Sequence, residues 1–126
     1  MSLKDYLATL QGVLVETPFV TSTSINYEER PPTAGIIKGT LLFTDGSQLD
    51  FKEFIINQPT LQIIKYAYNY RKEHLFIFRY DNAYDPAARH LPTYPSHKHV
   101  PQGILEAHQP SLSQVLQEIV SKLKFP

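Results

Sequence analysis

The chain contains no cysteine, so disulfides, thiolate metal sites and thiol redox chemistry are all excluded. It also has no excess of charge of either sign, because 12 Lys and Arg residues balance 12 Asp and Glu residues. No overall field therefore draws the protein to nucleic acid or to a membrane, and any such attraction must come from a local patch.

Long hydrophobic runs are absent as well. No apolar stretch approaches the roughly 20 residues of a membrane span, and the N-terminus lacks the apolar core of a signal peptide. The length fits one domain, and we expect residues 1–126 to form it. Together with the lack of cysteine, these absences predict a soluble, cytoplasmic protein that has no membrane partner.

Two segments have the periodicity of amphipathic helices, one at each end of the chain. In residues 2–15, apolar side chains recur on one face, and Ser2 with Asp5 resembles a capping box. Near the C-terminus, a second capping box at Ser111 precedes an apolar face that continues to about residue 123. We therefore predict an N-terminal and a C-terminal helix.

Five segments between these helices are rich in β-branched and aromatic residues, as strands are. They are residues 19–28, 36–43, 48–56, 61–70 and 75–80. Asp45-Gly46 predicts a tight type I′ hairpin, because these residues tolerate positive φ. The expected fold class is α+β, with a curved antiparallel sheet of about five strands flanked by the two helices.

The fourth of these strands places four side chains on one face: Ile64, Tyr66, Tyr68 and Tyr70. Such a tyrosine face is either a half-buried part of the core or a stacking platform for nucleic acid. Glu53 lies on the otherwise apolar face of the preceding strand. It is either a buried partner of Arg79 or a general acid or base.

Residues 83–110 contain five prolines and show no clear helix or strand pattern, so we predict a long loop there. A loop of this length is commonly a functional lid or a binding loop, and the alternative is a partly disordered arm. The overlapping segment from Arg71 to His99 carries five basic residues, three acidic residues and four histidines. It is the local basic patch in an otherwise neutral chain.

His97-Lys98-His99 is the most informative motif in this patch. The neighbouring prolines favour extended backbone, so that the two histidines project to one side and Lys98 to the other. Two imidazoles can supply a neutral base and a charged acid, the pair needed to cleave an RNA phosphodiester without metal. Arg79 would brace the phosphate and His90 would assist. A surface loop without a function is the alternative interpretation of the His-x-His motif.

Further residues are candidates for binding the substrate. Lys98 and Arg71 would hold phosphate, whereas Tyr68 and Tyr70 would offer a hydroxyl or a stacking surface.

A metal site is an alternative interpretation of the same histidines. His90, His97 and His99, or Asp81 in place of one of them, could form a three-ligand site of catalytic zinc type. The spacing to the third ligand fits no pattern that we can justify mechanistically, so we predict no cofactor. Asp81 also has a structural interpretation, because it can pair with Arg79 and bond its own backbone in a turn.

Several motifs occur in one order and spacing: Arg-Tyr-Asp-Asn-Ala at 79–83, Leu-Pro-Thr-Tyr-Pro at 91–95 and His-Lys-His at 97–99. With the opening segment 2–7 and the hairpin 39–49, they resemble the TumE-type toxins of prokaryotic type II toxin–antitoxin pairs. The resemblance spans nearly the whole chain. It implies a stand-alone intracellular toxin, encoded beside a helix-turn-helix antitoxin that neutralises it. Exposed strand edges leave a homodimer open.

The hypothesis from the sequence is therefore a toxin that cleaves RNA by metal-independent acid–base chemistry. His97 and His99 would exchange the proton while Arg79 and Lys98 hold phosphate. Two alternatives stay open. One is a metal-dependent hydrolase that uses the histidine cluster, and the other is a non-enzymatic module that docks its tyrosine face and proline-rich loop on a target.

Overall fold

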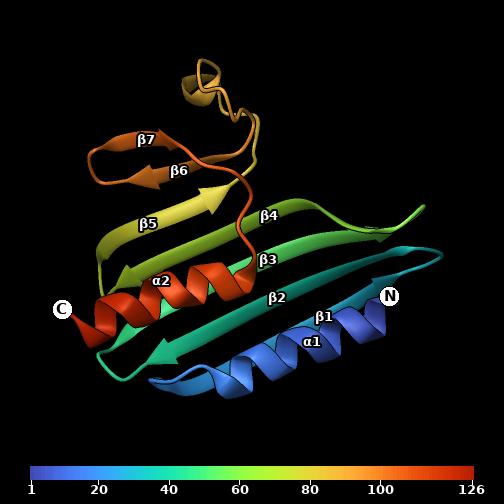
Figure 1. The fold of residues 1–126 in the computed structure, drawn as a ribbon, viewed down its shortest axis with the longest axis horizontal. Coiled ribbons are helices and arrows are strands. Elements are labelled where there is room, and N and C mark those ends of the chain that lie inside the picture. Colours follow the sequence, from blue (N-terminus) through green and yellow to red (C-terminus); the bar gives the residue numbers. More distant parts are fainter.

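The computed structural model describes residues 1–126 and contains two helices and one seven-stranded antiparallel sheet (Figure 1). Its elements are α1 (Leu3–Glu16), β1 (Val20–Arg30), β2 (Ala34–Phe43), β3 (Ser47–Asn57), β4 (Leu61–Lys72), β5 (Leu75–Asp81), the 3₁₀ turn η1 (Pro86–Ala88), β6 (His97–Val100), β7 (Gly103–Glu106) and α2 (Leu112–Lys124). Each strand pairs with the next, so that the sheet is a meander with β1 and β7 at its edges. The predicted α+β class is confirmed.

Both helices begin at the predicted capping boxes. The Ser2 hydroxyl accepts a hydrogen bond from the Asp5 amide, and the Asp5 carboxylate accepts one from the Ser2 amide in return. Ser111 and Gln114 make the same reciprocal pair at the start of α2. These caps satisfy amide groups that have no partner inside the helix, which explains why short local motifs fix where each helix starts.

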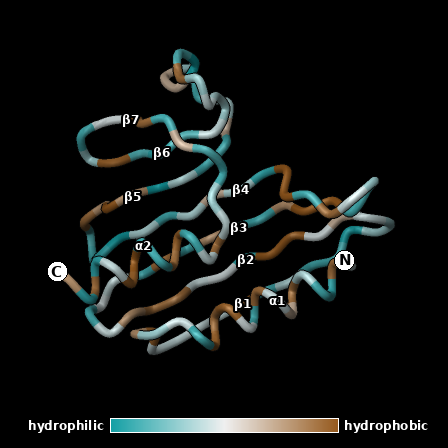
Figure 2. The backbone as a smooth tube through the Cα atoms, in the orientation of Figure 1, coloured by the Kyte–Doolittle hydropathy of each residue, from teal (hydrophilic) through white to brown (hydrophobic).

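One face of the sheet carries both helices and the whole hydrophobic core (Figure 1). Hydrophobic and hydrophilic segments alternate along both helices, as Figure 2 shows, and their apolar sides face the sheet. The helices contribute Leu10, Leu14, Leu112, Val115, Leu116 and Ile119 to the core. The opposite face of the sheet carries no helix, and we call it the open face.

The sheet has two more strands than the sequence predicts, because the predicted loop at 83–110 contains β6 and β7. Each of these strands is four residues long, too short for a period of two to stand out among the flanking prolines. Their pairing with β5 makes His97-Lys98-His99 part of the sheet. The expectation of a structureless loop is wrong for this part of the segment.

The turn between β2 and β3 also differs from the predicted type I′ hairpin. Three residues, Thr44 to Gly46, separate the strands, and within the turn only Gly46 has positive φ, at 84°. This geometry is typical of the three-residue hairpin loop, in which the last residue is left-handed. The longer turn shifts the register by one residue and places Lys38 directly opposite Lys52.

A bulge where β4 pairs with β3 changes the predicted tyrosine face. Tyr66, Tyr68 and Tyr70 point into the core, but the pairing shifts between Phe54 and Ile55. Ile64 is thereby turned outward and is 44% exposed, contrary to the prediction that it shares the tyrosine face.

Candidate functional site

The pairing of β5 with β6 brings four side chains together on the open face. Asp81 lies directly opposite His97, and Arg79 lies directly opposite His99. Because alternate residues of a strand point to the same face, all four side chains project from one small area of the sheet. The sequence prediction that His97 and His99 share a side is confirmed, and their rings pack edge to face with centroids 4.7 Å apart.

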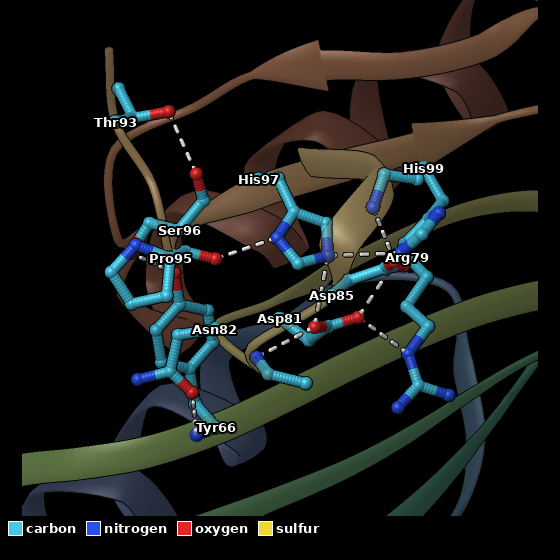
Figure 3. Close-up of polar contacts among 12 residues, drawn as sticks. Tyr66, Arg79, Asp81, Asn82, Asp85, Thr93, Pro95, Ser96, His97 and His99 are labelled. Atoms are coloured by element: carbon cyan, nitrogen blue, oxygen red, sulfur yellow. Dashed lines mark hydrogen bonds and ion pairs between the residues drawn. The ribbon is translucent and has the colours of Figure 1, made fainter. Parts of the chain in front are cut away.

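Three donor atoms converge at the centre of this area (Figure 3). The Nε2 atom of His97 lies 3.1 Å from Asp81 Oδ1 and 3.0 Å from the Nε2 atom of His99. His99 Nε2 in turn lies 3.5 Å from Asp81 Oδ2. We call Asp81, His97 and His99 the triad. Arg79 flanks it, with its Nε donating to Asp81 Oδ2 at 2.9 Å.

The second ring nitrogen of His97 fixes the orientation of the ring. His97 Nδ1 lies 2.6 Å from the carbonyl oxygen of Pro95, which can only accept, so this nitrogen carries the proton. In the neutral imidazole, Nε2 then has a lone pair that points at a carboxylate oxygen. A hydrogen, which the Nε2–H group of His99 can supply, or a metal cation therefore accounts for the close approach of this lone pair to the other atoms of the triad.

The triad has the geometry of a metal site. Donors that bind one ion at ~2.1 Å lie about 3.0–3.4 Å apart at octahedral or tetrahedral angles, close to the separations within the triad. Two imidazoles with one carboxylate form a ligand set that suits zinc or iron. The bond from His97 to the Pro95 carbonyl is also typical, because metal-bound histidines commonly donate their other N–H to an acceptor.

The triad opens on one side to an exposed pocket of about 610 Å³ that Arg79, Asp81 and His99 help to line. The side chains of Arg79 and His99 are 44% and 26% exposed, whereas His97 is fully buried. A ligand in the pocket can therefore reach His99 and Arg79 directly. His97 can act on such a ligand only through Asp81, His99 or a shared ion.

Hydrogen bonds to the backbone hold the end of β5, which carries Asp81. The Ala83 amide donates to Asp81 Oδ1, which is the predicted backbone turn. Asn82 accepts from the Tyr66 amide and donates to the Ile64 carbonyl, so that it links the end of β5 to β4. The bond to Ala83 agrees with the structural interpretation of Asp81. The same bond also fixes the position of the Asp81 carboxylate in the triad.

Lys98 lies on the other face of the sheet. Its Nζ donates to Glu118 of α2 at 2.8 Å and lies over the rings of Phe78 and Tyr80, 5.1 and 4.8 Å from their centroids. Burial alone would lower the pKa of Lys98, but hydrogen bonds with Glu118 and Tyr80 outweigh it and raise that pKa. The sequence correctly predicts that Lys98 projects to the opposite side of β6 from His97 and His99, and the structure places its ammonium group away from the triad.

The tyrosines expected to bind substrate are buried in the core. Tyr68 donates to Glu53 at 2.5 Å, and Tyr70 donates to Ser47 at 2.8 Å. Glu53 accepts a second bond from Tyr6 of α1 and has no contact with Arg79, which lies on the open face. The structure therefore does not bring these tyrosines or Glu53 to the triad.

The two remaining candidates also lie outside the triad. His90 is exposed in the connection between β5 and β6, and it is not among the converging donors. Arg71 pairs with Asp50 at 3.6 Å, near the far end of β4. The structure brings together the predicted alternative set in which Asp81 takes the place of His90. The signal for it is the position of Asp81, an acid at a strand end two residues from an arginine.

Comparison with known proteins gives one family. The sequence model of the family described as Toxin TumE matches residues 10–124, which is most of the chain. Curated proteins and solved structures give no match. Neither helix is long and apolar enough to cross a membrane. The match over residues 10–124 shows that the chain belongs to the TumE toxin family, and as such it is the toxin of a toxin–antitoxin pair.

Proposed function

We propose that this toxin inhibits growth by cleaving RNA phosphodiester bonds at the triad. One observation carries the proposal: two imidazoles, a carboxylate and a guanidinium converge beside an open pocket. Arg79 would bind the non-bridging oxygens of the phosphate, which a planar guanidinium can contact in pairs. The exposed edge of His99 would face the reacting atoms.

A divalent cation held by Asp81, His97 and His99 is the chemistry that the geometry supports best. The buried position of His97 suits a ligand better than a group that must touch the substrate. Bound there, the ion would polarise a phosphate oxygen and activate the attacking water. This ligand set is the predicted alternative in which Asp81 stands in place of His90.

Metal-independent acid–base cleavage is the second candidate, and the direct contacts within the triad favour it. The two Nε2 atoms are 3.0 Å apart, close enough to share a proton without an intervening ion. In this mechanism His99 takes the proton from the 2′-hydroxyl, the 2′-oxygen attacks phosphorus, and the 5′-oxygen leaves with a proton from solvent. Asp81 and His97 would orient His99.

The experiment is incubation of purified toxin with labelled RNA, with and without a chelator. Chelator-sensitive cleavage that also occurs at a 2′-deoxy position supports the metal mechanism, because the nucleophile is then water. Chelator-resistant cleavage that needs the 2′-hydroxyl supports the acid–base mechanism. If the His97→Ala, His99→Ala double variant cleaves RNA as fast as the parent, the proposal is wrong. His90→Ala is the matched control and should retain activity.

We further propose that the neutralising partner is a helix-turn-helix antitoxin encoded beside this gene. Family membership supports an antitoxin partner, and the type of antitoxin is our expectation. Expression of the toxin alone should stop growth, and expression of the neighbouring gene should restore it. The alternative of a non-enzymatic module has less support, because the tyrosine face that it would use is buried. A homodimer through the β1 or β7 edge stays a prediction.

A further inference from the structure

The open face of the sheet carries three neighbouring pockets that share lining residues and end at the triad, and together we call them the groove. One pocket of about 400 Å³ crosses β1 to β5, and a second of about 190 Å³ lies beside it over β3, β4 and β5. Arg79 lines both of them and also lines the pocket at the triad. A chain that lies in the groove can therefore pass Arg79 and reach His99.

Basic side chains line this groove in register with the triad. Strand pairing forms one row across the open face, which runs Asn26, Lys38, Lys52, Ala67, Asp81, His97. Adjacent strands are ~4.8 Å apart, so Lys52 and Lys38 lie about 10 and 14 Å from Asp81 along this row. The small side chain of Ala67 leaves the space between Lys52 and the triad open.

The lysines of the groove are unpaired. Lys38 and Lys52 are exposed and lie directly opposite each other, and neither forms an ion pair. Like charges in direct cross-strand positions destabilise a sheet. Lys65, which lines the second pocket with Lys52, also lacks a carboxylate partner. An anionic ligand would relieve this repulsion.

Two aromatic rings accompany the positive charge. Phe54 lies opposite Lys65 on the open face and lines the second pocket, while Phe76 lines the pocket at the triad and is 36% exposed. Cationic grooves that combine lysines with accessible aromatic rings are typical of sites for single-stranded nucleic acid, in which bases stack on the rings.

We infer that the open face binds a single strand of RNA, with successive phosphates at Lys38, Lys52 and Lys65 and the scissile phosphate at Arg79. The inference rests on the proposed RNA cleavage and adds to it a substrate class and a path. Charge complementarity and continuity with the triad favour RNA over the antitoxin as the occupant of this face.

The test measures binding rather than cleavage. Full-length toxin with His99→Ala is titrated into fluorescein-labelled single-stranded RNA, and anisotropy is recorded between 50 and 200 mM salt. A second protein carries Lys38→Gln and Lys52→Gln in addition to His99→Ala. The control adds Lys4→Gln and Lys122→Gln instead, which remove two exposed helix lysines and give the same net charge.

Loss of two phosphate contacts should weaken binding about 10- to 30-fold near 0.1 M salt and reduce the salt slope by about 1.4. The control pair should change neither quantity. Circular dichroism should show that both variants are folded, since all four lysines are exposed.

Equal binding by the Lys38 and Lys52 variant would overturn the inference, as would an equal loss in the control pair. Loss of antitoxin binding with RNA binding intact would also overturn it and assign the face to the antitoxin. RNA that is bound as expected but never cleaved by the parent protein would contradict the proposed function while supporting the path described here.

Discussion

Asp81 and His97 are direct cross-strand neighbours on β5 and β6, and their side chains meet with Asp81 Oδ1 3.1 Å from His97 Nε2. A second hydrogen bond orients each side chain: Asp81 accepts one from the Ala83 amide, and His97 Nδ1 donates one to the Pro95 carbonyl. The pair is therefore oriented before any ligand arrives, which is the requirement for an efficient binding or catalytic site.

Asp81→Asn should abolish stabilisation by metal. In the parent protein, Mn²⁺ or Zn²⁺ at about 100 times Kd should raise Tm by on the order of 5–10 °C, because the ion binds only the folded triad. The variant loses the charged ligand and should show little shift in differential scanning fluorimetry. Asp85→Asn is the matched control, since Asp85 lines the same pocket outside the triad. An equal shift in parent and Asp81 variant would exclude metal binding by the triad.

Arg79→Lys should lower kcat/KM for RNA cleavage by about 10- to 100-fold, because an ammonium cannot make the paired contacts of a guanidinium. Arg30→Lys is the control. Arg30 also pairs through Nε with a carboxylate two residues away on its own strand, that of Glu28 at 3.1 Å, but it lies on the edge strand β1. Steady-state rates should fall only for Arg79. Unchanged rates would mean that Arg79 serves only to hold Asp81.

Lys98→Ala should affect stability and leave RNA cleavage unchanged. It removes the contact with Glu118 and the packing on Phe78 and Tyr80, which together should cost about 1–2 kcal/mol. Urea unfolding measures the loss, and a double-mutant cycle with Glu118→Gln isolates the pair. A large drop in the rate of RNA cleavage by a folded Lys98→Ala variant would show that Lys98 takes part in the reaction.

Glu53→Gln should change the pH dependence of stability. Burial raises the pKa of Glu53, although bonds from Tyr6 and Tyr68 oppose the effect. Because the folded-state pKa is raised, the contribution of this carboxyl to the free energy of unfolding is fully present below its ordinary pKa of 4.5. That contribution is lost as the pH rises through the folded-state pKa. The free energy of unfolding of the parent relative to the Gln variant should therefore decrease from acid to neutral pH.

Glu53→Ala provides the complementary measurement. It leaves the hydroxyls of Tyr6 and Tyr68 without their partner and should cost about 1–3 kcal/mol for each of them at any pH. If the parent and the Gln variant respond identically to pH, the carboxyl does not titrate differently on folding.

The sequence alone determined the features that depend on neighbours along the chain. Capping boxes at Ser2 and Ser111 place both helix starts, because the partners lie three residues apart. Alternation puts His97 and His99 on one side and Lys98 on the other, because a strand has a period of two. The family motifs at 79–83, 91–95 and 97–99 are equally readable in the chain, and they gave the correct family.

Only the tertiary structure decided which distant residues meet. Asp81 joins the histidines because β6 pairs with β5, and the register of that pairing depends on long-range packing that no local pattern records. The turn at Gly46, one residue longer than predicted, sets Lys38 against Lys52, and the helices bury Tyr68 rather than leaving it for RNA. Which face of a sheet is covered depends on where the helices pack, because burial of apolar surface is a property of the whole fold.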